Sequence, residues 1–127
     1  MKFIVLSCLV FSIVLSQYQV SAQNNFTIVA STEPATAIIN NLKCSIEKGR
    51  VSLEWIINNN GLVNQIEVES SSDGKNYSMA ALIFSTEKNE SDNYYFYEKA
   101  KTGKLFYRLK ILHKDQTVLY SSVVSPE

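Results

Sequence analysis

Short runs in which apolar and polar side chains alternate fill most of the chain after residue 36. In one of them Val51, Leu53 and Trp55 share one parity, while Ser52 and Glu54 take the other. Successive side chains of a β-strand point to opposite faces of a sheet, so this spacing places the apolar residues on a single face. A chain with this pattern is expected to bury that face between antiparallel sheets.

Turn-forming residues separate seven such runs. The pairs Asn60-Gly61 and Asp73-Gly74 favour turns because these residues adopt positive φ at little cost. We expect a polar loop over residues 86–92. The expected strands cover residues 38–46, 51–57, 63–70, 77–84, 94–98, 104–112 and 117–124. The pattern predicts an all-β fold with the seven strands in an antiparallel sandwich.

The parity of the runs also assigns a core. Cys44 shares its parity with Leu42 and Ile46, so we expect a buried free thiol that packs as a small hydrophobe. The alternative for Cys44 is a disulfide between two chains. The residues expected inside one two-sheet core are Val51, Leu53, Trp55, Ile66, Val68, Tyr107, Leu109 and Ile111.

The first 22 residues have the layout of a secretory signal peptide. Lys2 gives a positive start, residues 3–15 are almost wholly apolar, and Val20-Ser21-Ala22 supplies small residues before a cleavage site at Gln23. A membrane anchor is the alternative, but the apolar run is shorter than the ~20 residues that a spanning helix needs. A lipoprotein signal at Cys8 is a further alternative, with little apolar sequence before it. We therefore expect a secreted, periplasmic or cell-surface protein.

Three parts follow from this division. We expect residues 1–22 to form the signal peptide, residues 23–36 to form a flexible leader or an edge strand at 26–30, and residues 37–127 to form the sandwich.

Removing the signal peptide leaves 11 basic and 12 acidic residues, a net charge of −1. This balance gives no electrostatic footprint for nucleic acid or an anionic membrane. Cys44 is then the single cysteine, so no internal disulfide is expected.

No grouping of residues predicts catalysis or metal binding. His113 is the one histidine, and its place before a hairpin turn predicts a solvated turn residue. One cysteine and one histidine do not make a metal site. Residues 73–76 lack the spacing of a calcium loop and are expected to form a hairpin turn. We expect a protein without enzymatic activity, cofactor or metal.

Four segments taken in order resemble one known family. They are VSLEW at residues 51–55, IEVESSSDGKNY at 66–77, YYFYE at 94–98 and FYRLKILHKDQTVLYSSVV at 106–124. Together they resemble the fibronectin type III-like modules of secreted bacterial proteins, often found next to type IX secretion sorting domains. Two positions depart from the family pattern: Glu69 stands where an arginine is common, and Asp115-Gln116 replaces an acid-Gly pair. Because the chain stops at Glu127, a freestanding module is expected.

The resemblance implies which strands are neighbours. It implies an immunoglobulin/fibronectin type III-like sandwich in which the third and sixth strands pair, as do the second and fifth. Glu67 and Glu69 on the third strand would then face Arg108 and Lys110 on the sixth, and we expect them to pair across the sheet. Tyr107 is expected to be a core residue that hydrogen-bonds back to the preceding loop.

The same likeness places a candidate binding surface. Tyr94 and Phe96 would point inward, so Tyr95 and Tyr97 would point outward, and Ile56 on the neighbouring strand would extend the patch. Exposed apolar patches mark interaction sites. The alternative is ordinary cross-strand pairing of aromatic residues that stabilises the sheet.

Two functions remain open from the sequence. The leading one is a non-catalytic binding or accessory module of the cell envelope or extracellular space that recognises an unknown protein or glycan through a sheet face or its loops. The alternative is a structural or assembly subunit that adds a strand at a sheet edge, with residues 26–30 as the donor.

Overall fold

The computed structural model describes residues 35–127. The expected signal peptide, its cleavage site and the expected strand at residues 26–30 lie outside the described residues. Within residues 35–127 we find no helix with the length and hydropathy needed to span a bilayer.

The fold of residues 35–127 is all-β, as predicted. One short 3-10 helix, η1 (Asn60–Leu62), joins the second and third strands. The strands are β1 (Ile38–Glu47), β2 (Arg50–Asn58), β3 (Val63–Ser71), β4 (Ser78–Phe84), β5 (Ser91–Lys99), β6 (Phe106–His113) and β7 (Val118–Tyr120).

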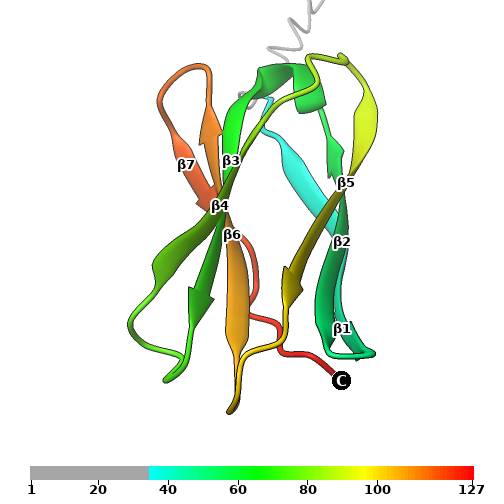
Figure 1. The fold of residues 1–127 in the computed structure, drawn as a ribbon. Coiled ribbons are helices and arrows are strands. Elements are labelled where there is room, and N and C mark those ends of the chain that lie inside the picture. Colours follow the sequence, from blue (N-terminus) through cyan, green and yellow to red (C-terminus); the bar gives the residue numbers. More distant parts are fainter. Residues whose placement is uncertain (1–34) are drawn as a thin grey trace, which may run out of the picture. The chain divides into compact units, whose positions relative to one another are not determined.

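These strands form two antiparallel sheets. The three-stranded sheet has the order β1-β2-β5, and the four-stranded sheet has the order β4-β3-β6-β7. Figure 1 shows the two groups of strands as separate layers. The arrangement fits a sandwich, in which each sheet turns its apolar face toward the other. The expected pairs of second with fifth and third with sixth strand are both present.

The predicted core is confirmed. All eight of its residues are at most 2% exposed, and they come from β2, β3 and β6. Trp55 stacks on Tyr94 with ring centroids 5.8 Å apart and an interplanar angle of 10°. The further apolar residues buried with them are Ala37, Ile57, Val63, Tyr94 and Leu105. The two-residue period therefore assigned the buried face of each of these strands correctly.

Most strand boundaries lie within two residues of the prediction, and the start of β5 and the end of β7 differ by more. β5 begins at Ser91 because its polar start pairs with the end of β2, where Asn58 faces Ser91. β7 ends at Tyr120, since the hydroxyl group of Ser121 accepts the backbone N–H of Leu109 at 2.8 Å in place of a regular ladder bond. Pairing with β6 resumes at Val124. Both differences depend on contacts between strands and not on local alternation.

The predicted charge pairs are present on the outer face of the four-stranded sheet. Lys110 Nζ lies 3.0 Å from Glu67 Oε2, and Arg108 Nε lies 2.6 Å from Glu69 Oε2. The hydrogen bond to Glu67 raises the pKa of Lys110. The Arg108 guanidinium also lies over the ring of Tyr77, at 4.0 Å from its centroid. Residues of β3 and β6, together with Tyr77 just before β4, therefore support the register of this face.

The prediction of a solvated His113 is wrong. His113 ends β6 with the same parity as Ile111 and is buried. Its Nε2 atom accepts the backbone N–H of Ala37 at 3.2 Å. The proton of the neutral ring then lies on Nδ1, which is 3.2 Å from the carbonyl oxygen of Thr117. His113 thus links the residue just before β1 with the hairpin between β6 and β7.

Tyr107 is a core residue, but its hydroxyl group bonds to a strand and not to the preceding loop. It donates a hydrogen bond to Glu98 Oε1 near the end of β5. Burial and this hydrogen bond raise the pKa of Tyr107. The contact joins the two sheets, because β5 and β6 belong to different ones.

Candidate functional site

Two tyrosines stand side by side on the outer face of β5. Tyr95 and Tyr97 are 55% and 54% exposed, whereas Tyr94 is buried and Phe96 is half-buried between them along the strand. The predicted faces of β5 are therefore confirmed, and no bulge exchanges them. Since β5 is an edge of the three-stranded sheet, both rings border solvent on the side away from β2.

The neighbours of the tyrosine pair are polar. Tyr95 faces Glu54 across the β2–β5 ladder, and Tyr97 faces Ser52. Ile56 faces Asn93, so it lies diagonal to Tyr95 and is half-buried. Ile56 therefore lies beside the tyrosine pair and not within it. The residues directly opposite the two aromatic rings carry hydrogen-bonding groups. We call Tyr95, Tyr97, Ser52 and Glu54 the tyrosine surface.

A shallow hollow adjoins Tyr97. It has a volume of about 450 Å³ and reaches the turn between β1 and β2. Its lining is formed by Glu47, Lys48, Arg50, Ser52 and Tyr97. An aromatic face next to arginine, lysine and hydroxyl donors suits a ligand that has both flat apolar faces and polar groups. Local alternation missed this hollow, because Arg50 and Lys48 approach Tyr97 only through the β2–β5 pairing.

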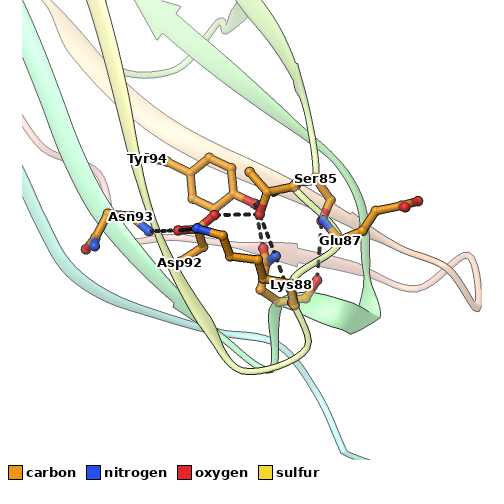
Figure 2. A network of polar contacts seen from close by, with 8 residues as sticks. Ser85, Glu87, Lys88, Asp92, Asn93 and Tyr94 are labelled. Carbon is orange, nitrogen blue, oxygen red and sulfur yellow. Dashed lines mark hydrogen bonds and ion pairs between the residues drawn. The ribbon is translucent and has the colours of Figure 1, made fainter.

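A network of polar contacts lies at the opposite end of β5 (Figure 2). Asn60 is fully buried and donates from Nδ2 to Thr86 Oγ1 at 3.1 Å and to the carbonyl oxygen of Lys88 at 3.0 Å. Its Oδ1 atom accepts the hydroxyl proton of Tyr94 at 2.5 Å. Asp92 accepts hydrogen bonds from Thr86 and Lys88, which lower its pKa.

This network has a structural role. The side-chain oxygen and nitrogen of Asn60 both have partners, so its burial leaves no polar atom of that side chain unsatisfied. The contacts hold the segment between β4 and β5 against η1. The Asn60-Gly61 pair predicts only a turn, and the buried role of Asn60 has no local signal because its partners lie 26 to 34 positions away.

The turn at residues 73–76 is confirmed. The Asp73 carboxylate accepts the backbone N–H groups of Lys75 and Asn76, both at 2.8 Å. These bonds, together with those from the side chains of Asn76 and Ser71, lower the pKa of Asp73 far below its usual range. Gly74 adopts a φ of +72°, which glycine tolerates best. The carboxylate is therefore engaged within its own turn.

Cys44 is a free, half-buried thiol that faces Leu53 across β1 and β2. Burial raises its pKa to about 11. A thiol with this pKa is almost entirely protonated at neutral pH and is a poor nucleophile. Its position agrees with the expected packing role, although it is less buried than expected.

Among residues 35–127, no three side chains of His, Cys, Asp or Glu are grouped so that they could hold a metal ion. Comparisons of the chain with protein-family models, with curated proteins and with solved structures found no match. We take the tyrosine surface as the candidate site because Tyr95 and Tyr97 are both more than half exposed on one face of β5.

Proposed function

We propose that this chain is a secreted, non-catalytic binding module that recognises a protein or a glycan through the tyrosine surface. One observation carries the proposal: two tyrosines at positions i and i+2 remain more than half exposed on one face of an edge strand. Tyr97 also lines a hollow, together with the side chains of a glutamate, a lysine, an arginine and a serine.

The chemistry of tyrosine supports this role. Its ring offers a large contact area with few rotatable bonds, and its hydroxyl group hydrogen-bonds at the rim of a contact. Two such rings on one strand stand ~7 Å apart by strand rise. That spacing suits two successive flat faces, such as adjacent sugar rings or side chains of an extended peptide.

The resemblance to fibronectin type III-like modules agrees with the strand pairing of both sheets. In such modules the sandwich is a scaffold and the binding groups lie on its faces or loops. Placement outside the cytoplasm follows from the signal-peptide layout of residues 1–22. N-terminal sequencing of exported protein should give a terminus near Gln23, and an intact Met1 would contradict this part of the proposal.

The absence of catalysis is also part of the proposal. Both ring nitrogens of His113 are engaged, by Ala37 and by Thr117. The thiol of Cys44 is held protonated. Neither group is therefore available as the base or nucleophile that a reaction would require.

The test is the double variant Tyr95→Ser/Tyr97→Ser, compared with the double variant Val118→Ser/Tyr120→Ser. Both pairs stand at i and i+2 on edge strands, with similar exposure. Binding to a glycan array and capture of envelope proteins should fall at least ~10-fold for the first variant, equivalent to ~1.4 kcal/mol. The second variant should bind like the native protein.

Two results would overturn the proposal. If the Tyr95→Ser/Tyr97→Ser protein folds and still binds, the active surface lies elsewhere. If that variant unfolds while the control variant stays folded, the two tyrosines act in stability and not in recognition. Circular dichroism and the midpoint of urea unfolding separate these results from a true loss of binding.

A further inference from the structure

The four edge strands of the two sheets differ in how they are protected from pairing with other strands. β1 is interrupted by an irregularity between Asn40 and Lys43. β5 carries charges at Asp92, Glu98 and Lys99, and β7 has three residues. An irregular ladder, charged side chains and a short strand each hinder pairing of an edge strand with a strand of another molecule.

β4 lacks charge and proline along its whole length. Its seven residues are Ser-Met-Ala-Ala-Leu-Ile-Phe. Leu82 is 43% exposed and Phe84 is 69% exposed on the outer face of the four-stranded sheet. In the described part of the chain, β4 pairs with β3 alone. An uncharged apolar edge of this kind is a template for strand pairing.

The free backbone groups of β4 can be assigned. The N–H of Ser85 donates to the carbonyl oxygen of Asn64, on the side of β3. Backbone groups alternate sides along a strand, so the groups of Ile83 also face β3 while those of Leu82 and Phe84 face away. The irregularity at Val68/Glu69 ends this regular stretch near Ala80. Two residues therefore present two N–H and two C=O groups at the open edge.

The outward N–H and C=O groups of one β4 strand can hydrogen-bond to the same groups of a second β4 strand. In an antiparallel pair centred on Ile83, Leu82 faces Phe84 of the other strand, and each of these pairs exchanges two hydrogen bonds. All four open groups are then satisfied, and each Phe84 ring lies beside a Leu82 side chain. A contact in which the same patch serves both partners is the one that a two-fold dimer requires.

The charge balance favours a second copy as the occupant. After removal of the signal peptide the chain carries 11 basic and 12 acidic side chains, a net charge of −1. Two copies therefore approach with little net repulsion, and no like charges meet within the paired strands. We propose that the β4 edge pairs antiparallel with β4 of a second copy of this chain, joining the two four-stranded sheets into one of eight strands.

The test is sedimentation equilibrium of protein expressed from residues 1–127, with the mass of the processed form checked first. Concentrations from about 5 to about 500 µM cover the dissociation constants of weak complexes. The native protein should reach twice its monomer mass within this range. Leu82→Lys and Phe84→Lys should each weaken the dimer at least ~10-fold, because they bury a charge at its centre.

Val118→Lys is the matched control. Val118 is 46% exposed on the outer face of the same sheet, at its other edge. This variant should dimerise like the native protein. The proposal is overturned if the native protein stays monomeric up to the highest concentration, if the Leu82 and Phe84 variants dimerise as well as the native protein, or if a different protein co-purifies on this edge instead.

Leu82→Pro separates strand pairing from simple adhesion of apolar side chains. Proline removes the outward N–H of Leu82 while the ladder to β3 does not use that group. The dimer should be lost although the side chain stays apolar, and an unchanged dimer of this variant would overturn strand pairing. Tyr95→Ser/Tyr97→Ser should leave the dimer intact. A wrong dimer proposal can therefore be told apart from a wrong proposal for the binding function.

Discussion

At the scale of the residue, Trp55 is the largest side chain in the core. It is 2% exposed and stacks on Tyr94. Its indole N–H has no hydrogen-bond partner among the described residues. The ring therefore contributes through packing and dispersion, and a substitution acts mainly on the volume that it fills.

We expect Trp55→Ala to lower the free energy of unfolding by ~3–5 kcal/mol, the range for removal of a large buried aromatic ring. Trp55→Phe should be tolerated better, because it retains a ring against Tyr94 and removes an unpaired donor. Urea titration followed by circular dichroism measures both. A loss under ~1 kcal/mol for Trp55→Ala would contradict the packing described for the core.

Sequence reasoning at this scale worked for apolar residues and failed for buried polar ones. Val68 and Leu109 follow from parity alone, because burial of an apolar side chain needs no particular partner. His113 has the parity of the core, but its burial depends on the N–H of Ala37, 76 positions away. Asn60 depends in the same way on Tyr94. These hydrogen-bond partners can be identified only when the arrangement of the strands in space is known.

At the scale of the element, the β3–β6 pair carries a ladder of charges. Glu67 faces Lys110 and Glu69 faces Arg108 in the register of the two strands. The second pair has an additional contact, because the Arg108 guanidinium lies over the rings of Tyr77 and Tyr120. Stacking restrains the arginine side chain before it meets the carboxylate, so less conformational entropy is lost in the pair.

A double-mutant cycle with Glu67→Gln and Lys110→Met should give a coupling energy near the low end of ~0.2–1 kcal/mol. The cycle with Glu69→Gln and Arg108→Met should give a larger value. Free energies of unfolding at low and high salt measure both, and each coupling should weaken as salt is added. Equal couplings would mean that the two tyrosine rings do not restrain Arg108.

The strands themselves were predicted better than their ends. Alternation located the centres of all seven, because each turns one apolar face inward. The polar start of β5 has no apolar period, and it joins the sheet through pairing with Ile57 and Asn58 of β2. Parity alone predicted which tyrosines of β5 point outward. The position of Ile56 relative to Tyr95 and Tyr97 depends instead on the register of β2 against β5, and the sequence of a single strand does not contain that register.

At the scale of the whole molecule, several acidic groups make stability depend on pH. Hydrogen bonds lower the pKa of Asp73, Asp92 and Asp115 in the folded state. A group with a lowered folded pKa binds its proton more readily when the chain is unfolded. Its contribution is therefore present above its ordinary pKa of 3.8 and is lost as the pH falls toward the folded value.

We expect the midpoint temperature of thermal unfolding to decrease as the pH is lowered below about 4. Asp73→Asn should make this decline shallower, because the amide does not titrate. Asp115→Asn offers a comparison at a second turn, where Thr117 lowers the pKa of the carboxyl group. An Asp73→Asn protein with an unchanged acid profile would show that this turn does not contribute to the pH dependence.

The break in the β1–β2 ladder affects the exchange of backbone hydrogens with solvent. Pairing stops at Asn40 and resumes at Lys43, and Asn41 adopts a φ of +52° between them. The register shift leaves Asn41 and Leu42 without facing residues on β2, so we expect their amides to exchange faster than those on either side. The shift divides β1 into one part that begins beside His113 and another that continues into the hairpin to β2, and exchange rates measured along β1 would show whether the two parts open separately.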